Sequence, residues 1–285
     1  MNSPTVARRA LARILKTARE EAGRTGAQAS KYAGIHPGTL SRVENAETKI
    51  APGTAMLLAR FYGASEEDCD LVVELARAGR ERSWWQRYKS IPTWFDGYIG
   101  LETEAREISS YQAELIPGLL QTPDYVRALS KTLITQDSDE EIEQRIALRQ
   151  DRQKRLSSET AVDFHAVINE SALRRRVGGS EAMRIQLAHL VAMSERGNIT
   201  IQVLSFESGA HAAHEGAFTV MRFPVQKDQK IELPDVTYVE YPQGALYLEE
   251  PHTVANFSSI FANVADQALN PEDSVAFIQQ VLDEH

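Results

Sequence analysis

QASKYAGIHPGTLSRVEN, residues 28–45, is the stretch of sequence that decides the fold of the N-terminal part. Gly34 interrupts its helical pattern, because glycine readily takes the positive φ that a tight turn requires. Pro37 then suits the first turn of a new helix, where a backbone N–H group is not needed. The stretch therefore predicts two short helices, over 26–33 and 37–45, joined by a glycine turn.

Amphipathic segments on both sides extend this pair into a small helical domain. Upstream, apolar residues at three- and four-residue spacing predict a helix over 6–22, which Gly23 ends. Downstream, Pro52 begins a fourth helix, and the acidic residues from Glu66 suit the positive N-terminus of a fifth that fades at Gly79. We therefore predict a mainly α, five-helix domain over residues 1–80.

The segment from Thr39 to Glu44, Thr-Leu-Ser-Arg-Val-Glu, resembles the recognition helix of the Xre-type, or phage-repressor-like, helix-turn-helix family. The N-terminal half of such a helix contacts base edges in the major groove of DNA. Pro37 and Gly38 stand where the family often has base-reading side chains, and neither can hydrogen-bond a base through its side chain. The resemblance thus assigns base reading to polar neighbours, above all to Arg42, which can bind guanine through two hydrogen bonds. The set is His36, Thr39, Ser41 and Arg42.

The same resemblance implies contacts to the DNA backbone and one ion pair inside the domain. Free backbone N–H groups and polar side chains near the helix ends are expected to hold phosphates. Gly26 stands where the family often has a glutamine. The resemblance also places Arg19 of the first helix against Glu44 as a partly buried ion pair. The expected phosphate contacts are Gly26, Ala27, Lys31, Asn45 and Lys49.

The charge distribution supports nucleic-acid binding by the N-terminal part alone. The net charge of −9 would by itself argue against a nucleic-acid ligand. Residues 1–49, however, hold nine Lys and Arg against four Asp and Glu, whereas residues 50–285 hold 22 against 36. A basic head on an acidic body is typical of a DNA-reading domain joined to a separate module.

Apolar runs and cysteines limit the class of protein further. No apolar run approaches the ~20 residues that span a bilayer, and no apolar stretch follows the N-terminal arginines as it would in a secretory signal. Cys69 is the only cysteine, which excludes an internal disulfide and a zinc site built on several thiolates. We expect a cytoplasmic protein without membrane association.

The polar segment 79–83 is the expected domain boundary, because the pattern changes after it. Aromatic residues cluster over 84–98, and we predict a long helix over 92–115, followed by helices that begin at Pro123 and Ser138. Strands and helices then follow one another, so we expect residues 84–285 to form an α+β domain with a small mixed or antiparallel sheet and flanking helices. The expected strands are 162–168, 199–204, 218–223, 236–241 and 245–248, and the later helices are 180–196, 254–268 and 271–283.

The segment from Ile116 to Tyr125, Ile-Pro-Gly-Leu-Leu-Gln-Thr-Pro-Asp-Tyr, also carries a resemblance. It is similar to a C-terminal domain of unknown function found in many actinobacterial Xre-type regulators, which are often described as antitoxin-like and are commonly encoded beside a small protein. This resemblance implies regulation through a small protein partner. We also expect a homodimer on double-stranded DNA, because one short recognition helix reads few base pairs.

Other functions remain open from the residues alone. The 84–98 aromatics could pack between domains, or line a pocket that senses a small molecule. Pro37 and Gly38 leave open an adaptor with a degenerate helix-turn-helix. His211, His214 and Glu215 carry zinc-ligand chemistry but lack the helical His-Glu-x-x-His spacing. Because no phosphate-binding glycine loop or nucleophile turn appears either, we expect no enzyme, metal or cofactor.

Overall fold

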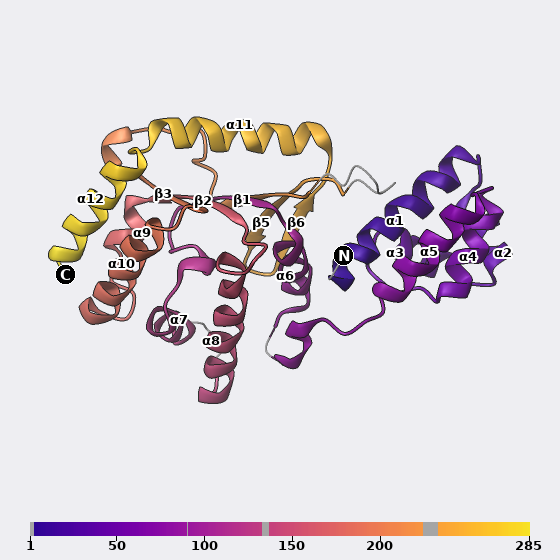
Figure 1. The fold of residues 1–285 in the computed structure, drawn as a ribbon, viewed down its shortest axis with the longest axis horizontal. Coiled ribbons are helices and arrows are strands. Elements are labelled where there is room, and N and C mark those ends of the chain that lie inside the picture. The colour runs from indigo at the N-terminus through magenta and orange to yellow at the C-terminus, as the bar shows by residue number, and fades with distance from the viewer. Residues whose placement is uncertain (1–2, 90, 133–136, 225–232) are drawn as a thin grey trace. The chain divides into compact units, whose positions relative to one another are not determined.

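The computed structural model describes residues 3–89, 91–132, 137–224 and 233–285, and these fall into two compact units (Figure 1). The first unit contains residues 3–86 with Pro224 and Leu233, and the second contains the other described residues. None of the helices in these ranges is long and apolar enough to cross a membrane. Each unit has its own core.

The first unit is mainly α, as the sequence predicted. Its helices enclose one core, in which Leu15, Leu40, Leu58 and Val72 are at most 1% exposed. The hydrophobic effect of burying such side chains is what holds short helices together, since an isolated helix of eight residues is unstable in water. The helices are α1 (Pro4–Glu21), α2 (Gly26–Ala33), α3 (Pro37–Glu44), α4 (Pro52–Phe61) and α5 (Glu66–Ala78).

A mixed sheet forms the centre of the second unit. Within the described residues it has six strands in the order β3-β2-β1-β4-β5-β6. Strands β1, β2 and β3 run parallel to one another, and β4, β5 and β6 continue the sheet antiparallel from β1. The strands are β1 (Glu107–Gln112), β2 (Asp163–Asn169), β3 (Ile199–Leu204), β4 (Phe218–Arg222), β5 (Val236–Tyr241) and β6 (Gly244–Leu248).

Helices cover both faces of this sheet. Figure 1 shows α11 along one face and α6, α7 and α8 on the other. Tyr111, Val167 and Phe218 of the sheet share a buried cluster with Phe261 and Val264 of α11. The helices of this unit are α6 (Thr93–Glu104), α7 (Pro123–Ser130), α8 (Asp139–Gln153), α9 (Glu170–Arg174), α10 (Ser180–Ser194), α11 (Pro251–Gln267) and α12 (Pro271–Asp283).

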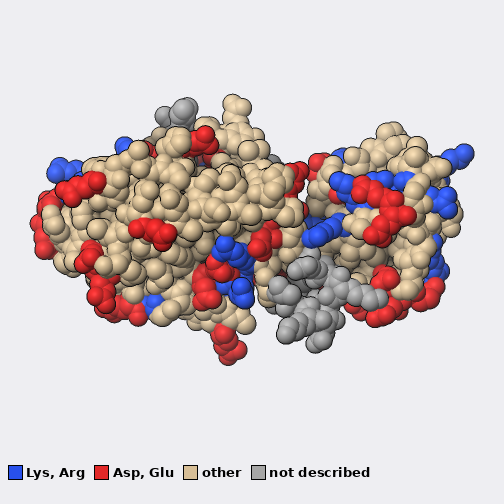
Figure 2. Space-filling view, turned by 90° about the horizontal axis from the view of Figure 1, so that it is seen from above, with Lys and Arg blue, Asp and Glu red and all other residues tan. Residues whose placement is uncertain are grey.

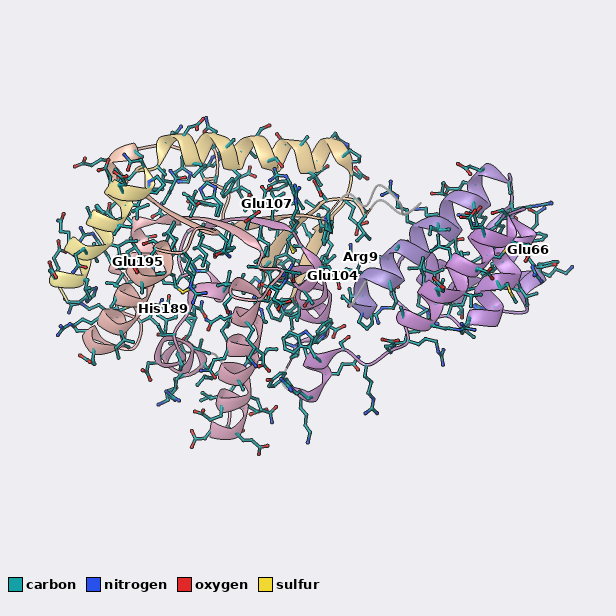
Figure 3. All side chains as sticks on the ribbon, viewed as in Figure 1. Arg9, Glu66, Glu104, Glu107, His189 and Glu195 are labelled. Atoms are coloured by element: carbon teal, nitrogen blue, oxygen red, sulfur yellow. The ribbon has the colours of Figure 1, made fainter. Side chains whose placement is uncertain are left out.

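The long helix predicted over 92–115 is wrong. Helix α6 ends at Glu104, and Ala105 turns the backbone to an extended ψ of 136°. Strand β1 follows and lies between β2 and β4, with Glu107 at its start (Figure 3). Because strands flank it on both sides and helices cover both faces, its four central residues are all buried and show no alternation. That pattern is the reason why periodicity did not reveal this strand.

Candidate DNA interface

Side-chain caps and a glycine turn set the path of the chain through α2 and α3. The Thr25 hydroxyl accepts a hydrogen bond from the Gln28 N–H group, while the Gln28 side chain accepts one from the Thr25 N–H group. Gly34 ends α2 with φ 66° and ψ 30°, in the left-handed region that favours glycine. Pro37 then begins α3. This is the connection predicted from the sequence.

One face of α3 is buried and the opposite face is exposed. Leu40 and Val43 are at most 2% exposed and fix the helix on the core. Gly38, Ser41, Arg42 and Asn45 are exposed, and their three- and four-residue spacing places them on one stripe of the helix. A stripe of this kind on a two-helix motif is what enters a major groove.

Arg42 is exposed in the middle of this stripe. Its Nε atom donates to the Gly38 carbonyl at 3.3 Å, and its Nη atoms have no hydrogen-bond partner among the described residues. Asn45, predicted as a phosphate contact, lies three residues further along the same stripe as Arg42. The Arg42 guanidinium can therefore form bidentate hydrogen bonds with a base, and Ser41 and Asn45 lie beside it.

His36 caps α3, a role that the sequence prediction did not include. Its Nδ1 atom accepts a hydrogen bond from the Gly38 N–H group at 3.1 Å. An accepting Nδ1 carries no proton, so the neutral ring holds its proton on Nε2. The exposed His36 ring thus offers a donor next to the stripe, and acceptors such as guanine O6, guanine N7 or a phosphate oxygen suit it. Thr39, by contrast, is half-buried and lies off the stripe.

The N-terminus of α2 carries free donors. The Thr25 carbonyl and hydroxyl take the N–H groups of Ala29 and Gln28, which leaves those of Gly26 and Ala27 without a partner among the described residues. Such N–H groups and the helix dipole favour a phosphate. Gln28 was missed as a candidate: its Oε1 atom completes the cap, so its exposed amide N–H₂ group points outward. The spacing Thr-x-x-Gln, a capping box, was the signal that could have found it.

The two lysines predicted to contact phosphates are both exposed. Lys31 lies in the last turn of α2. Lys49 follows α3, and its Nζ atom is 3.4 Å from the Arg80 carbonyl oxygen, a long contact that a phosphate can replace. Figure 2 shows basic side chains beside acidic ones on the visible face of the first unit.

Arg19 of α1 holds the C-terminal end of α3. Its guanidinium makes two hydrogen bonds with the Glu44 carboxylate, of 2.7 and 3.0 Å. Glu44 also lies near Tyr62, whose buried hydroxyl has no hydrogen-bond partner in the described part of the chain. Burial, with Glu44 adding to it, raises the pKa of Tyr62 to about 12, so this tyrosine is neutral at physiological pH. The ion pair fixes the angle at which α3 presents its stripe.

The structure also places the histidines and the cysteine that the sequence analysis considered for zinc or thiol chemistry. Among the described residues, no three His, Cys, Asp or Glu side chains lie close enough to hold a metal ion. His211 contacts the Tyr111 hydroxyl through Nε2 at 3.4 Å, and His214 Nδ1 lies 3.3 Å from the His211 carbonyl oxygen. Cys69 is buried in the helical core, where burial raises the pKa of its thiol and disfavours the reactive thiolate.

Comparison with known protein families identifies both units. A family model described as a domain of unknown function, DUF5753, matches residues 95–280. The chain belongs to the DUF5753 family. A helix-turn-helix model matches residues 15–69, from within α1 to within α5. No curated protein and no solved structure matches this DUF5753 chain.

The two matches divide the chain as the structure does. The helix-turn-helix match contains all of α2 and α3, and with them the exposed stripe of Ser41, Arg42 and Asn45. The DUF5753 match begins in α6 and ends in α12. The protein is therefore a DNA-binding regulator of the Xre-like helix-turn-helix type with a DUF5753 domain behind it. The family description assigns no function to that second domain.

Proposed function

We propose that this protein is a sequence-specific transcriptional regulator that reads double-stranded DNA through α3. The exposed stripe around Arg42, held by the buried Leu40 and Val43, is the observation that carries the proposal. His36 and Ser41 supply further donors to base edges, while the N-terminus of α2, Lys31 and Lys49 supply phosphate contacts. Pro37 and Gly38 are the residues that favour the alternative, an adaptor that does not bind DNA. Polar side chains that can contact bases lie on both sides of them.

Selection from random duplex DNA tests sequence specificity. The full chain is mixed with a randomised duplex library, bound DNA is recovered over several rounds, and the enriched sequences are read. We expect one enriched motif, with binding that weakens steeply as salt rises because phosphate contacts release counterions. Recovery of unbiased sequences would reject the proposal and favour the adaptor.

We also propose a two-fold homodimer. Helix-turn-helix dimers place their recognition helices in two half-sites about 34 Å apart, which doubles the number of base pairs read. A symmetric dimer then requires a palindromic operator, so the enriched motif tests this proposal together with light scattering of the free protein. A single half-site, or a monomer at micromolar concentration, would contradict it.

We further propose that the second unit binds a small regulatory protein and has no catalytic role. Within the described part of the chain, strand β6 ends the sheet and pairs with β5 alone, whereas α12 packs against β3 at the other edge. Leu246 of β6 and Tyr241 of the adjoining hairpin are 49% and 48% exposed. An exposed strand edge with apolar side chains can accept a strand from a partner.

Affinity purification from the native host tests this partner. We expect a small protein in a one-to-one ratio with the chain, and Leu246→Glu should remove it. Ile185→Glu is the matched control, because Ile185 on α10 is 42% exposed and lies far along the chain from β6. If both variants or neither variant loses the partner, β6 is not the docking edge.

A further inference from the structure

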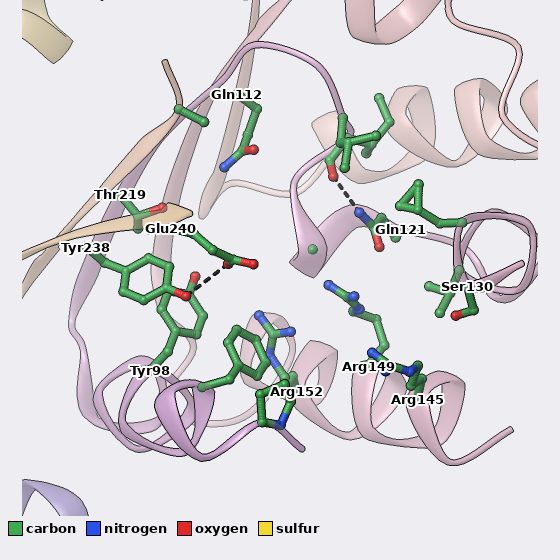
Figure 4. Close-up of a pocket in the computed structure, with 18 of the residues that line it drawn as sticks. Tyr98, Gln112, Gln121, Ser130, Arg145, Arg149, Arg152, Thr219, Tyr238 and Glu240 are labelled. Atoms are coloured by element: carbon green, nitrogen blue, oxygen red, sulfur yellow. Dashed lines mark hydrogen bonds between the residues drawn. The ribbon is translucent and has the colours of Figure 1, made fainter. Parts of the chain in front are cut away.

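A cavity of about 440 Å³ lies in the second unit between α6, α8 and the sheet (Figure 4). This volume is in the range of small-molecule sites in proteins. The 116–121 segment closes a further side of it. Neither DNA reading nor a partner strand at β6 uses this cavity, so its lining requires a separate explanation.

One wall of the cavity is aromatic. Trp94, Phe95 and Tyr98 of α6 line it, with the Phe95 and Tyr98 rings stacked at a centroid distance of 5.1 Å. Tyr238 of β5 continues the wall, 4.5 Å from the Tyr98 ring. The cluster predicted over 84–98 is thus divided: Trp84 and Trp85 belong to the first unit, whereas Trp94, Phe95 and Tyr98 line this cavity. Flat apolar groups pack well on such a wall.

Three arginines of α8 face the cavity in a row. Arg145, Arg149 and Arg152 have four- and three-residue spacing, so they share one helix face, and like charges at this spacing repel one another. Two of the three have carboxylate partners. Arg145 Nε is 2.8 Å from Asp137, and Arg152 makes two hydrogen bonds of 2.7 Å with Glu102, a pair at most 3% exposed.

Arg149 is the exception, because it has no hydrogen bond or ion pair among the described residues. It is half-buried, and its guanidinium points into the cavity toward Glu240 in Figure 4. Burial and the neighbouring charge of Arg152 lower the pKa of Arg149. Gly118 makes room for it, since a side chain at this position would collide with the Arg149 Nη1 atom. A poorly solvated charge without a partner destabilises the empty protein.

The cavity also offers free acceptors. Gln121 is 5% exposed, and its Nε2 atom donates to the Ile116 carbonyl at 2.7 Å. Its buried Oε1 atom has no hydrogen-bond partner among the described residues. Glu240 accepts from the Tyr238 hydroxyl through Oε2 at 2.9 Å. A buried unsatisfied acceptor costs free energy until a donor reaches it. The cavity therefore holds one arginine that pairs with no carboxylate among the described residues, although Glu240 shares the lining, and at least one acceptor that no described donor reaches.

We propose that the cavity binds a small organic acid. Its carboxylate pairs with Arg149, its flat apolar body lies against Trp94, Phe95 and Tyr98, and a hydroxyl or amine group donates to Gln121 or Glu240. A planar carboxylate matches the fork of a guanidinium, and it neutralises the one arginine of the row that lacks a partner. Binding then relieves the repulsion along α8.

The probe for this site is 4-hydroxyphenylacetate, which combines a carboxylate, an aromatic ring and a hydroxyl donor. Its neutral counterpart, 4-hydroxyphenylacetamide, has nearly the same shape without the charge. Binding to the full chain without DNA is followed by ligand-observed NMR titration at millimolar concentrations. We expect saturable binding of the acid, at least tenfold tighter than that of the amide. Because no DNA is present, failure here leaves the proposed DNA reading untouched.

Variants locate the probe in the cavity. Arg149→Met should weaken binding of the acid at least tenfold and leave the free protein as heat-stable as before or more stable, because a repelling charge is removed. Gly118→Ala, which displaces the guanidinium but keeps its charge, should also weaken binding. Arg184→Met, at an exposed position of α10, should change neither property.

Four results would overturn the proposal. The first is no detectable binding of the acid, and the second is equal binding of acid and amide. The third is unchanged binding by Arg149→Met. The fourth is a large loss of heat stability in Arg149→Met, because Arg149 would then stabilise the fold in the absence of a bound anion.

Discussion

Arg19 and Glu44 join α1 to the last residue of α3 through two parallel hydrogen bonds, Nε to Oε1 at 2.7 Å and Nη2 to Oε2 at 3.0 Å. Their side chains are 15% and 9% exposed, so the charges are partly shielded from water. The paired geometry is the strongest that arginine and a carboxylate form. This ion pair therefore both stabilises the first unit and fixes the position of its recognition helix, α3.

Replacing Glu44 by glutamine should therefore destabilise the first unit. The change removes the carboxylate that binds Arg19 at 2.7 Å and leaves the longer, exposed contact with Glu20 at 3.4 Å. We expect a loss of about 1.5–3 kcal/mol in the free energy of opening α1 and α3. Hydrogen exchange measured by mass spectrometry reports this opening peptide by peptide. The matched control is Glu66→Gln at the start of α5 (Figure 3), which removes an exposed ion pair with Arg60 and should have a much smaller effect because water solvates both charges. Equal effects of the two variants would contradict the prediction.

Arg42→Ala should weaken binding to the selected operator without changing the fold. Loss of a bidentate contact to a base costs about 1–3 kcal/mol of binding free energy, or about 5- to 150-fold in affinity. Titration of fluorescent operator DNA measures the change, and the base preference at one position of the motif should relax with it. Arg60→Ala removes the same charge from an exposed site on α4 and should have a smaller effect. An Arg42→Ala variant that binds the operator as the wild type does would show that α3 reads DNA in another way.

Glu102→Gln should be among the most destabilising single changes in the second unit. Burial alone would lower the pKa of Arg152, but the Glu102 carboxylate outweighs it and raises that pKa. Without this carboxylate, Arg152 is a buried charge beside Arg149, and removal of one partner from a buried pair costs about 3–5 kcal/mol. Urea unfolding measures the loss, with hydrogen exchange to assign it to the second unit.

The control for Glu102→Gln is Glu143→Gln, which weakens an exposed contact with Arg127 on the surface of α8. Its expected effect is below about 1 kcal/mol. A mild Glu102→Gln variant, similar to the control, would mean that water or a neighbouring group solvates Arg152 after the change.

Local signals explain which parts of the fold were predictable. The predicted bounds of β3 and α12 agree with the structure, because alternating apolar residues mark Ile199–Leu204 and an Asn-Pro start marks Pro271. Strand β1 was missed, because Ser109 and Ser110 are buried between neighbouring strands and leave no apolar period. Its place depends on β2 and β4, which lie far away in the sequence.

The cavity could not be predicted from the sequence either, because it also depends on residues that lie far apart along the chain. The spacing of Arg145, Arg149 and Arg152 is visible in the sequence, but the sequence does not tell which arginine lacks a partner. That depends on Glu102, some 50 residues upstream of Arg152, and on the space left by Gly118. The exposed stripe of α3, by contrast, follows from one short segment and its caps, so sequence alone placed Ser41 and Arg42 side by side.

Asp151 of α8 makes the stability of the second unit depend on pH in the acidic range. Burial by itself would raise its pKa, but hydrogen bonds from Lys154, Tyr88 and Arg87 lower it to about 2 from 3.8. A carboxylate with a lowered folded-state pKa stabilises the protein fully above its unfolded pKa. This contribution therefore begins to fall below about pH 4 and is lost as the pH passes through about 2.

Asp151→Asn should accordingly be less stable than the wild type near neutral pH, by about 1–2 kcal/mol after allowance for the exposed partners Arg87 and Lys154. Below about pH 3 the difference should shrink, because the wild-type carboxyl group then takes up a proton and loses its ion pairs. Urea unfolding of both proteins across this pH range measures the difference, with Glu181→Gln on the exposed face of α10 as the control. A difference between wild type and Asp151→Asn that stays constant with pH would show that shape, rather than the charge of Asp151, holds the 87–88 segment against α8.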